Sequence, residues 1–140
     1  NDAIKSILSA KLLEAQNRGI SISVEIEEPV SNFRIELLDF ITVLSVLCDN
    51  AIEATIEAIN PRMTVAFMNN DDSLVLIVEN SIKTEKVDVS RIFARGYSSK
   101  GEGRGLGLHN VNSILEKYPK STITTRSANH LFSQTIRFCK

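Results

Sequence analysis

The chain has 140 residues, of which 43% are hydrophobic and 24% charged, and this is the composition of an ordinary globular domain with its own core. The formal net charge of −1 gives no bulk field that would favour nucleic acid or an anionic membrane surface. No apolar run approaches the roughly 18 residues needed to cross a bilayer. The two cysteines, Cys48 and Cys139, lack paired spacing, so we expect reduced thiols in a cytosolic setting.

The first 60 residues predict a helix, a strand and a longer helix. Apolar side chains recur at helical spacing over residues 2–18. Residues 20–27 alternate between apolar and polar side chains, which predicts a strand with one buried face. A broad apolar stripe then begins near Ile35, and Pro61 ends it, so we expect a long helix here.

Polar side chains interrupt the apolar stripe of this long helix at Asp49, Asn50 and Glu53. Asn50 and Glu53 are one turn apart and therefore share a face. An unpaired buried polar group costs roughly 1–3 kcal/mol, so these groups need partners or water. They either form the edge of a metal or ligand site or simply face water at one rim of the helix.

Two further strands are expected at residues 63–68 and 74–79, joined by a polar hairpin turn. The second strand is continuously apolar, which is typical of a central strand. It ends at Asn80 and Ser81, where polar side chains either contact a ligand or only begin a turn.

Residues 82–104 have no sustained period, and a segment of this length inside a compact domain is typical of a functional lid or of disorder. Within it, residues 96–100 supply hydroxyls and a cation. The strip 101–108 alternates glycine with other residues and opens into a predicted helix from 107 to about 117. Glycine permits close backbone approach, and a helix N-terminus offers free N–H groups, so this strip either binds phosphate or is a plain loop.

Two strands, 121–127 and 131–139, close the chain. The order predicts an α+β fold with helices on one face of a mostly antiparallel sheet. No βαβ crossover precedes the glycines, and Gly-Lys-Ser/Thr is absent, which argues against Rossmann and Walker A sites. His109 and His130 have no ligand spacing, so we expect no zinc site.

Three stretches resemble motifs of the gyrase, chaperone, histidine kinase and mismatch-repair ATPase (GHKL) superfamily. Residues 47–54, Leu-Cys-Asp-Asn-Ala-Ile-Glu-Ala, resemble its N box. Residues 104–108 resemble its second glycine box, and residues 92–93 with 96–100 resemble its F box and ATP lid. The resemblance covers the whole chain and implies a Bergerat-type fold, a two-layer α/β sandwich that binds ATP.

A finer resemblance is to histidine kinases of the AgrC type, which sense peptide pheromones. It rests on residues 11–15 before a Gly-Ile strand, on residues 78–81, and on Gly-Tyr-Ser-Ser-Lys at 96–100. It implies the cytoplasmic domain of a bacterial membrane-anchored receptor, with roles in two-component signalling, quorum sensing and regulation of virulence.

The resemblance also implies roles for single residues. Asn50 would bind the Mg²⁺ that bridges the ATP phosphates, with Asp49 and Glu53 holding metal-bound waters or orienting Asn50. Asn80 would read adenine, and Phe93 would anchor the lid by packing. The remaining nucleotide-binding positions would be Ser99, Lys100, Arg104, Gly105, Leu106, Gly107 and Leu108, and the catalytic residues Asn50, Asp49 and Lys100.

Two departures from the family pattern affect the expected activity. The first glycine box, Asp-x-Gly-x-Gly, is replaced by Asn80-Ser81, so we expect weaker nucleotide binding than with Asp. Val46 stands one turn before Asn50, where hydrolases of the superfamily carry a residue that activates water. This favours transfer of the γ-phosphate to another acceptor over hydrolysis.

We therefore expect a protein histidine kinase fragment, inactive without its phosphoacceptor. Residues 1–18 would be a connector helix, and residues 19–140 the ATP-binding catalytic domain with a lid at about 82–104. The expected partners are an upstream dimerisation domain with the acceptor histidine and a response regulator, with a monomeric fragment and a homodimeric full-length protein. The alternatives are a degenerate nucleotide-binding or scaffold module, or an anti-sigma-type Ser/Thr kinase.

Overall fold

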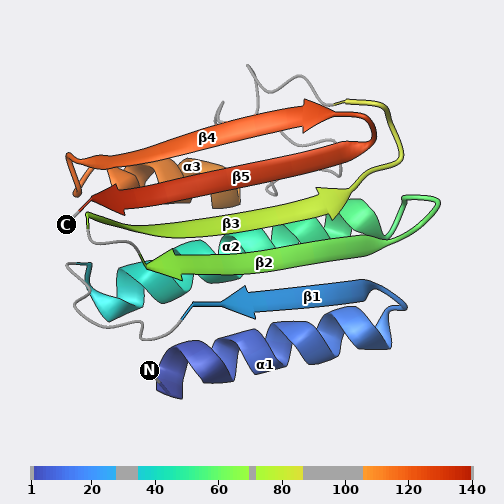
Figure 1. The fold of residues 1–140 in the computed structure, drawn as a ribbon, viewed down its shortest axis with the longest axis horizontal. Helices are drawn as coiled ribbons and strands as arrows, with labels where there is room; N and C mark the ends of the chain where they lie inside the picture. The colour runs from blue at the N-terminus through green and yellow to red at the C-terminus, as the bar shows by residue number, and fades with distance from the viewer. Residues whose placement is uncertain (1, 28–34, 70–71, 87–105, 140) are drawn as a thin grey trace.

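The computed structural model describes residues 2–27, 35–69, 72–86 and 106–139, which form three helices and one five-stranded sheet (Figure 1). The elements in chain order are α1 (Asp2–Asn17), β1 (Ser21–Ile26), α2 (Leu37–Thr55), β2 (Arg62–Asn69), β3 (Ser73–Ser81), α3 (Leu106–Leu115), β4 (Ser121–Ala128) and β5 (Leu131–Cys139). Every predicted helix and strand is present. Most ends differ from the prediction by one or two residues, but α2 ends at Thr55, several residues before Pro61, where we expected the helix to stop.

The strand order is β1-β2-β3-β5-β4. β1 is parallel to β2, and the other three pairs are antiparallel. Helices α2 and α3 lie behind one face of the sheet, while α1 runs beside the edge strand β1 (Figure 1). The predicted two-layer α+β architecture with a mixed, mostly antiparallel sheet is confirmed.

The core lies between the sheet and α2. β3 is the middle strand, and Leu74, Leu76 and Val78 point from it to the helices, following the period of two of a strand. Phe40 of α2 is almost fully buried, with its ring centroid 5.5 Å from that of Phe67 on β2. The continuous apolar sequence of β3 thus reflects its central place in the sheet.

α1 is attached to the rest of the molecule by an apolar stripe and one ion pair. Ile4, Leu8 and Ala15 are buried at helical spacing. Lys11 on the same helix lies 2.5 Å from the carboxylate of Asp49 on α2, measured from Nζ to Oδ1. That this helix continues from an upstream domain stays a prediction.

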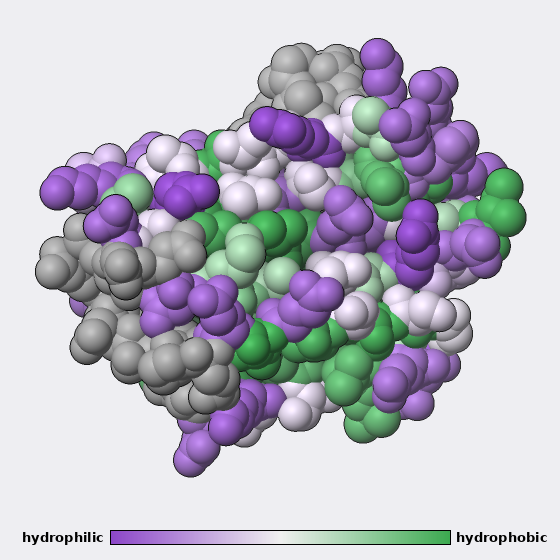
Figure 2. All heavy atoms as spheres, viewed as in Figure 1, coloured by the Kyte–Doolittle hydropathy of each residue, from purple (hydrophilic) through white to green (hydrophobic). Residues whose placement is uncertain are grey.

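The opposite face of the sheet carries no helix in the described part of the chain. Figure 2 views the molecule from this side and shows hydrophobic surface along the middle strands with hydrophilic residues around it. Ala66 and Val75 on this face are nonetheless buried. The described helices are too short or too polar to span a membrane.

Several chain segments meet at the end of the sheet where β3 finishes. The β4–β5 turn lies there, and its residues Asn129 and His130 have positive φ angles of 53° and 62°. His130 contacts the segment after β3 three times. Its N–H donates to Glu85 O (2.8 Å), its carbonyl accepts from Ile82 N (2.9 Å), and its Nδ1 lies 3.2 Å from Lys83 O. The start of the predicted lid is thereby tied to the sheet.

Candidate functional site

The structure describes about half of the predicted site. Asp49, Asn50, Glu53, Asn80, Gly107 and Leu108 are described, as is the backbone of Leu106. Phe93, Ser99, Lys100, Arg104, Gly105 and the rest of the predicted lid from 87 on lie outside the described residues. The roles predicted for those positions stay predictions.

The α2 residues predicted to belong to the site lie in the C-terminal half of the helix and differ in their surroundings. Asn50 and Glu53 are half-buried, at the rim of the helix. Asp49 accepts a hydrogen bond from Lys11, and the exposed fractions of the two side chains are 46% for Asp49 and 15% for Lys11. The carboxylate of Asp49 therefore balances a lysine that is mostly covered by protein.

Asn80 lies on the helix-covered face of β3, near the C-terminal end of the strand. Its residue neighbours across the sheet are Met63 on β2 and Phe132 on β5. It is only 2% exposed, and its Nδ2 donates to Ser81 O at 3.0 Å. A buried amide in an apolar setting can select a planar ligand that offers matching hydrogen-bonding groups. A ligand without those groups would leave the amide without a hydrogen-bond partner.

α3 begins close to α2. A Cβ built on Gly107 would lie only 3.1 Å from Cγ1 of Val46, so glycine is what lets the two helices approach here. Val46 is one turn before Asn50 and on the same side of α2. The first turn of α3, with its unpaired N–H groups and positive dipole end, therefore opens beside the polar part of α2.

Asn50 thus lies on α2, and the elements that carry Asn80 and Gly107, β3 and α3, both pack on that helix. Sequence reasoning singled out Ser81 at the end of β3 but missed Thr55 in the last turn of α2. Both residues are buried, and a 2.7 Å contact joins their hydroxyls. The sequence signal for both residues was a polar side chain near the end of an otherwise apolar helix or strand.

A metal cluster built from acidic, histidine and cysteine side chains is not found among the described residues. Burial raises the pKa of the Cys48 thiol from 9.0 to about 12, so this neighbour of Asp49 is a protonated thiol near neutral pH. The side-chain oxygen of Asn50 is a hard ligand of the type that Mg²⁺ prefers, since this ion keeps waters and substrate oxygens for the rest of its octahedron.

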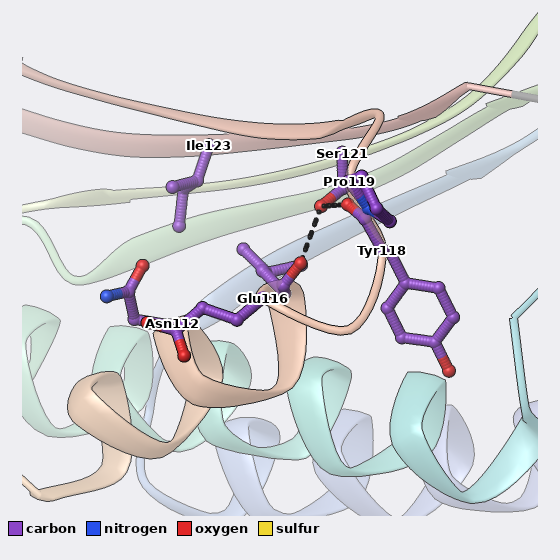
Figure 3. Close-up of a pocket in the computed structure, with 7 residues that line it drawn as sticks. Asn112, Glu116, Tyr118, Pro119, Ser121 and Ile123 are labelled. Carbon is purple, nitrogen blue, oxygen red and sulfur yellow. Dashed lines mark hydrogen bonds between the residues drawn. The ribbon is translucent and has the colours of Figure 1, made fainter.

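A cavity of about 230 Å³ lies at the other end of α3, between its last turn and β4 (Figure 3). Ser121, one of its lining residues, donates to the carbonyls of Leu115 and Tyr118 at 3.1 and 2.7 Å. The ring of Tyr118 points away towards the start of α2 (Figure 3), where its hydroxyl donates to Asp39 at 2.6 Å. Burial and this hydrogen bond raise the pKa of Tyr118 above 10.0. The cavity is separate from the predicted site.

Solved structures with the same fold define the class of domain. The catalytic domain of the histidine kinase ThkA, in a nucleotide-free form, superimposes with a TM-score of 0.83 over 100% of this chain and 91% of that chain, at 21% identity. Full-length ShkA in complex with AMPPNP gives a TM-score of 0.79 over 96% of this chain and 28% of that chain, at 15% identity. The fold is therefore that of histidine kinase catalytic domains.

The sequence comparisons define the family. Residues 35–139 match the family model described as GHKL domain, and the chain belongs to this family. It is also 29% identical over 119 residues to the sensor protein CitS of Bacillus subtilis (strain 168), an alignment that covers 81% of this chain and 22% of CitS. The chain thus spans less than a quarter of the length of this relative.

Proposed function

We propose that this chain is a protein histidine kinase catalytic domain, which binds Mg-ATP and transfers the γ-phosphate to a histidine on a separate dimerisation domain. The observation that carries the proposal is that α2, the helix that bears Asn50, packs both on β3, the strand that bears Asn80, and on α3, whose glycine-led start approaches Val46. Membership of the GHKL family and the fold shared with histidine kinase catalytic domains support it.

In this proposal Asn50 holds Mg²⁺ and Glu53 orients waters bound to it. When bound, the ion would supply positive charge that offsets the negative charge developing on the phosphate during transfer. Asp49 is the weaker candidate for this task, because its carboxylate already pairs with Lys11.

Asn80 reads adenine in the same proposal. Its amide oxygen would accept a hydrogen bond from the exocyclic amine, and its neighbours across the sheet, Met63 and Phe132, are both apolar. A neutral amide accepts more weakly than a carboxylate, so we expect modest affinity.

The phosphates would lie at the first turn of α3, where Gly107 keeps the backbone close to α2. Ser99, Lys100, Arg104 and Gly105 are proposed to complete the phosphate site from the segment before α3.

The chemistry proposed for this chain is positioning and charge neutralisation. Val46 is apolar and cannot activate water, which disfavours hydrolysis. Of the two histidines, His109 lies on α3 and His130 in the β4–β5 turn, so neither lies in a helical hairpin of the described chain. The acceptor histidine is therefore expected on another domain.

The wider assignment rests on the resemblance to AgrC-type kinases and on the sensor protein that this chain resembles in sequence. We propose a homodimeric, membrane-anchored receptor with this domain in the cytoplasm, a response regulator as partner, and a quorum-sensing role that can include virulence control. A degenerate nucleotide-binding or scaffold module and an anti-sigma-type Ser/Thr kinase are the alternatives.

The test compares ATP with GTP binding to the wild type and to Asn80→Leu, which has a similar volume without the amide. We expect the wild type to prefer ATP by about tenfold and the variant to lose that preference. Asn112→Leu, a change at an exposed asparagine of α3, is the matched control and should keep it. Unchanged selectivity in Asn80→Leu would remove Asn80 from the site, and a wild type that binds no nucleotide at millimolar concentration would favour the scaffold alternative.

A further inference from the structure

Two buried hydroxyls join the helix that carries Asn50 to the strand that carries Asn80. Thr55 is 0% exposed and Ser81 is 6% exposed, and their side-chain oxygens lie 2.7 Å apart. The two residues are 26 positions apart in the sequence. This is a direct side-chain hydrogen bond between the last turn of α2 and the C-terminal end of β3.

The pair is part of a longer hydrogen-bonded chain that includes the loop between α2 and β2. Arg62 N–H donates to Thr55 Oγ1 at 2.9 Å, and Ser81 Oγ donates to Asn60 O at 2.8 Å. One consistent direction runs from Arg62 N–H through the two hydroxyls to Asn60 O. Such a chain is polarised along its length, and loss of one hydroxyl leaves buried groups without a partner.

This arrangement bears directly on both asparagines. Asn80 is the residue before Ser81, so the contact that holds Ser81 to α2 also restricts the strand backbone from which the Asn80 side chain projects. Asn50 is five residues before Thr55, about 7.5 Å along the axis of a stiff helix. The contact between Thr55 and Ser81 therefore restricts how far the backbones at Asn50 and Asn80 can move relative to each other.

The apolar contacts between α2 and the sheet do not set that separation equally well. Hydrophobic contact is non-directional and by itself specifies no particular pair of atoms. Hydrogen bonds between buried hydroxyls restrict both distance and angle. The polar pair occurs in the part of the interface between α2 and β3 that lies beside the proposed nucleotide site.

We propose that Thr55 and Ser81 are positioning residues of the nucleotide site, which hold Asn50 and Asn80 at the spacing that one Mg-ATP molecule requires. This inference rests on the proposed function. Neither hydroxyl contacts the nucleotide, and both act through the asparagines beside them.

The test measures Mg-ATP affinity by calorimetry and the free energy of unfolding by urea for Thr55→Val, Thr55→Ser and Ser81→Ala. We expect Thr55→Val and Ser81→Ala to bind Mg-ATP about tenfold more weakly at temperatures where both are folded. Thr55→Ser keeps the hydroxyl and should retain nearly wild-type affinity. Thr42→Val is the matched control, because Thr42 on the same helix donates only to Leu38 O within α2 at 2.8 Å.

A second readout needs no nucleotide. In amide NMR spectra of the folded domain, Thr55→Val should shift the side-chain signals of Asn80, and Thr42→Val should not. Weaker stability with unchanged affinity and unchanged Asn80 signals would overturn the positioning role. If the wild type binds no nucleotide the proposed function fails, and the Asn80 signals then decide whether Thr55 orients that amide.

Discussion

His130 has a backbone conformation that most side chains avoid, with φ of 62° in a two-residue turn. Its backbone hydrogen bonds to residues 82 and 85 do not depend on the side chain. His130→Gly and His130→Ala both remove the ring, but only glycine adopts this φ without strain. We expect His130→Gly to be more stable than His130→Ala by about 1 kcal/mol in urea unfolding. Equal stabilities would show that the turn relaxes to another conformation.

Gly107 and Val46 are expected to be coupled, since a Cβ at residue 107 would lie 3.1 Å from Cγ1 of Val46. Gly107→Ala gains helix propensity but crowds this contact. Val46→Ala removes the crowding, so Gly107→Ala should be more favourable in that background by about 1 kcal/mol. A double-mutant cycle in urea measures the coupling, and additive effects would contradict the close approach of α3 to α2.

Cys48 and Cys139 should differ sharply in reactivity. Cys139 is exposed, whereas burial raises the pKa of Cys48 from 9.0 to about 12. A thiol reagent at pH 8 should therefore modify one thiol of the native protein, and none in Cys139→Ser, whereas the unfolded chain should expose both. Rapid modification of native Cys139→Ser would contradict the burial of Cys48.

The same shift predicts a pH dependence of stability. Below pH 9.0 the Cys48 thiol is protonated in the folded and unfolded chains alike. Above it only the unfolded chain loses the proton, so the free energy of unfolding should fall as pH rises from about 9 towards 12. Urea unfolding over this range should show a smaller decrease in Cys48→Ala than in the wild type.

At the scale of elements, α1 and α2 are joined by the Lys11–Asp49 pair. Lys11→Glu would place two carboxylates together, and we expect a loss of about 1 kcal/mol, kept small because Asp49 is partly solvated. The double reversal Lys11→Glu with Asp49→Lys should recover most of that loss in urea unfolding. Arg18→Glu, which removes an exposed pair with Glu14, is the control. Failure of the double reversal would show that the pair contributes only packing.

The local pattern of apolar and polar residues predicted the helices and strands well. Burial on one face imposes a period of about four residues on a helix and of two residues on a strand. The α2 stripe and the continuously apolar β3 are clear cases. The contacts between elements were not predicted. Lys11 and Asp49 are 38 residues apart, and Thr55 and Ser81 are 26 apart, so no local period reports that they meet.

At the scale of the whole molecule, the resemblance of three short motifs predicted the family, and the match over residues 35–139 confirms it. The α+β architecture was also predicted, since the order of elements restricts how layers can form. The strand order β1-β2-β3-β5-β4 was not, because it depends on pairings that residue patterns leave open. The roles of the site residues remain predictions, because they depend on how a ligand binds and not on how the chain packs.

The central claim is that this domain binds Mg-ATP through Asn50, and titration calorimetry with and without Mg²⁺ tests it most directly. We expect one nucleotide per chain, bound more tightly with Mg²⁺, and a loss of about tenfold or more in Asn50→Ala. Asn112→Ala, at an exposed position of α3, should bind as the wild type does. Equal affinities of the wild type and Asn50→Ala for Mg-ATP would contradict the claim.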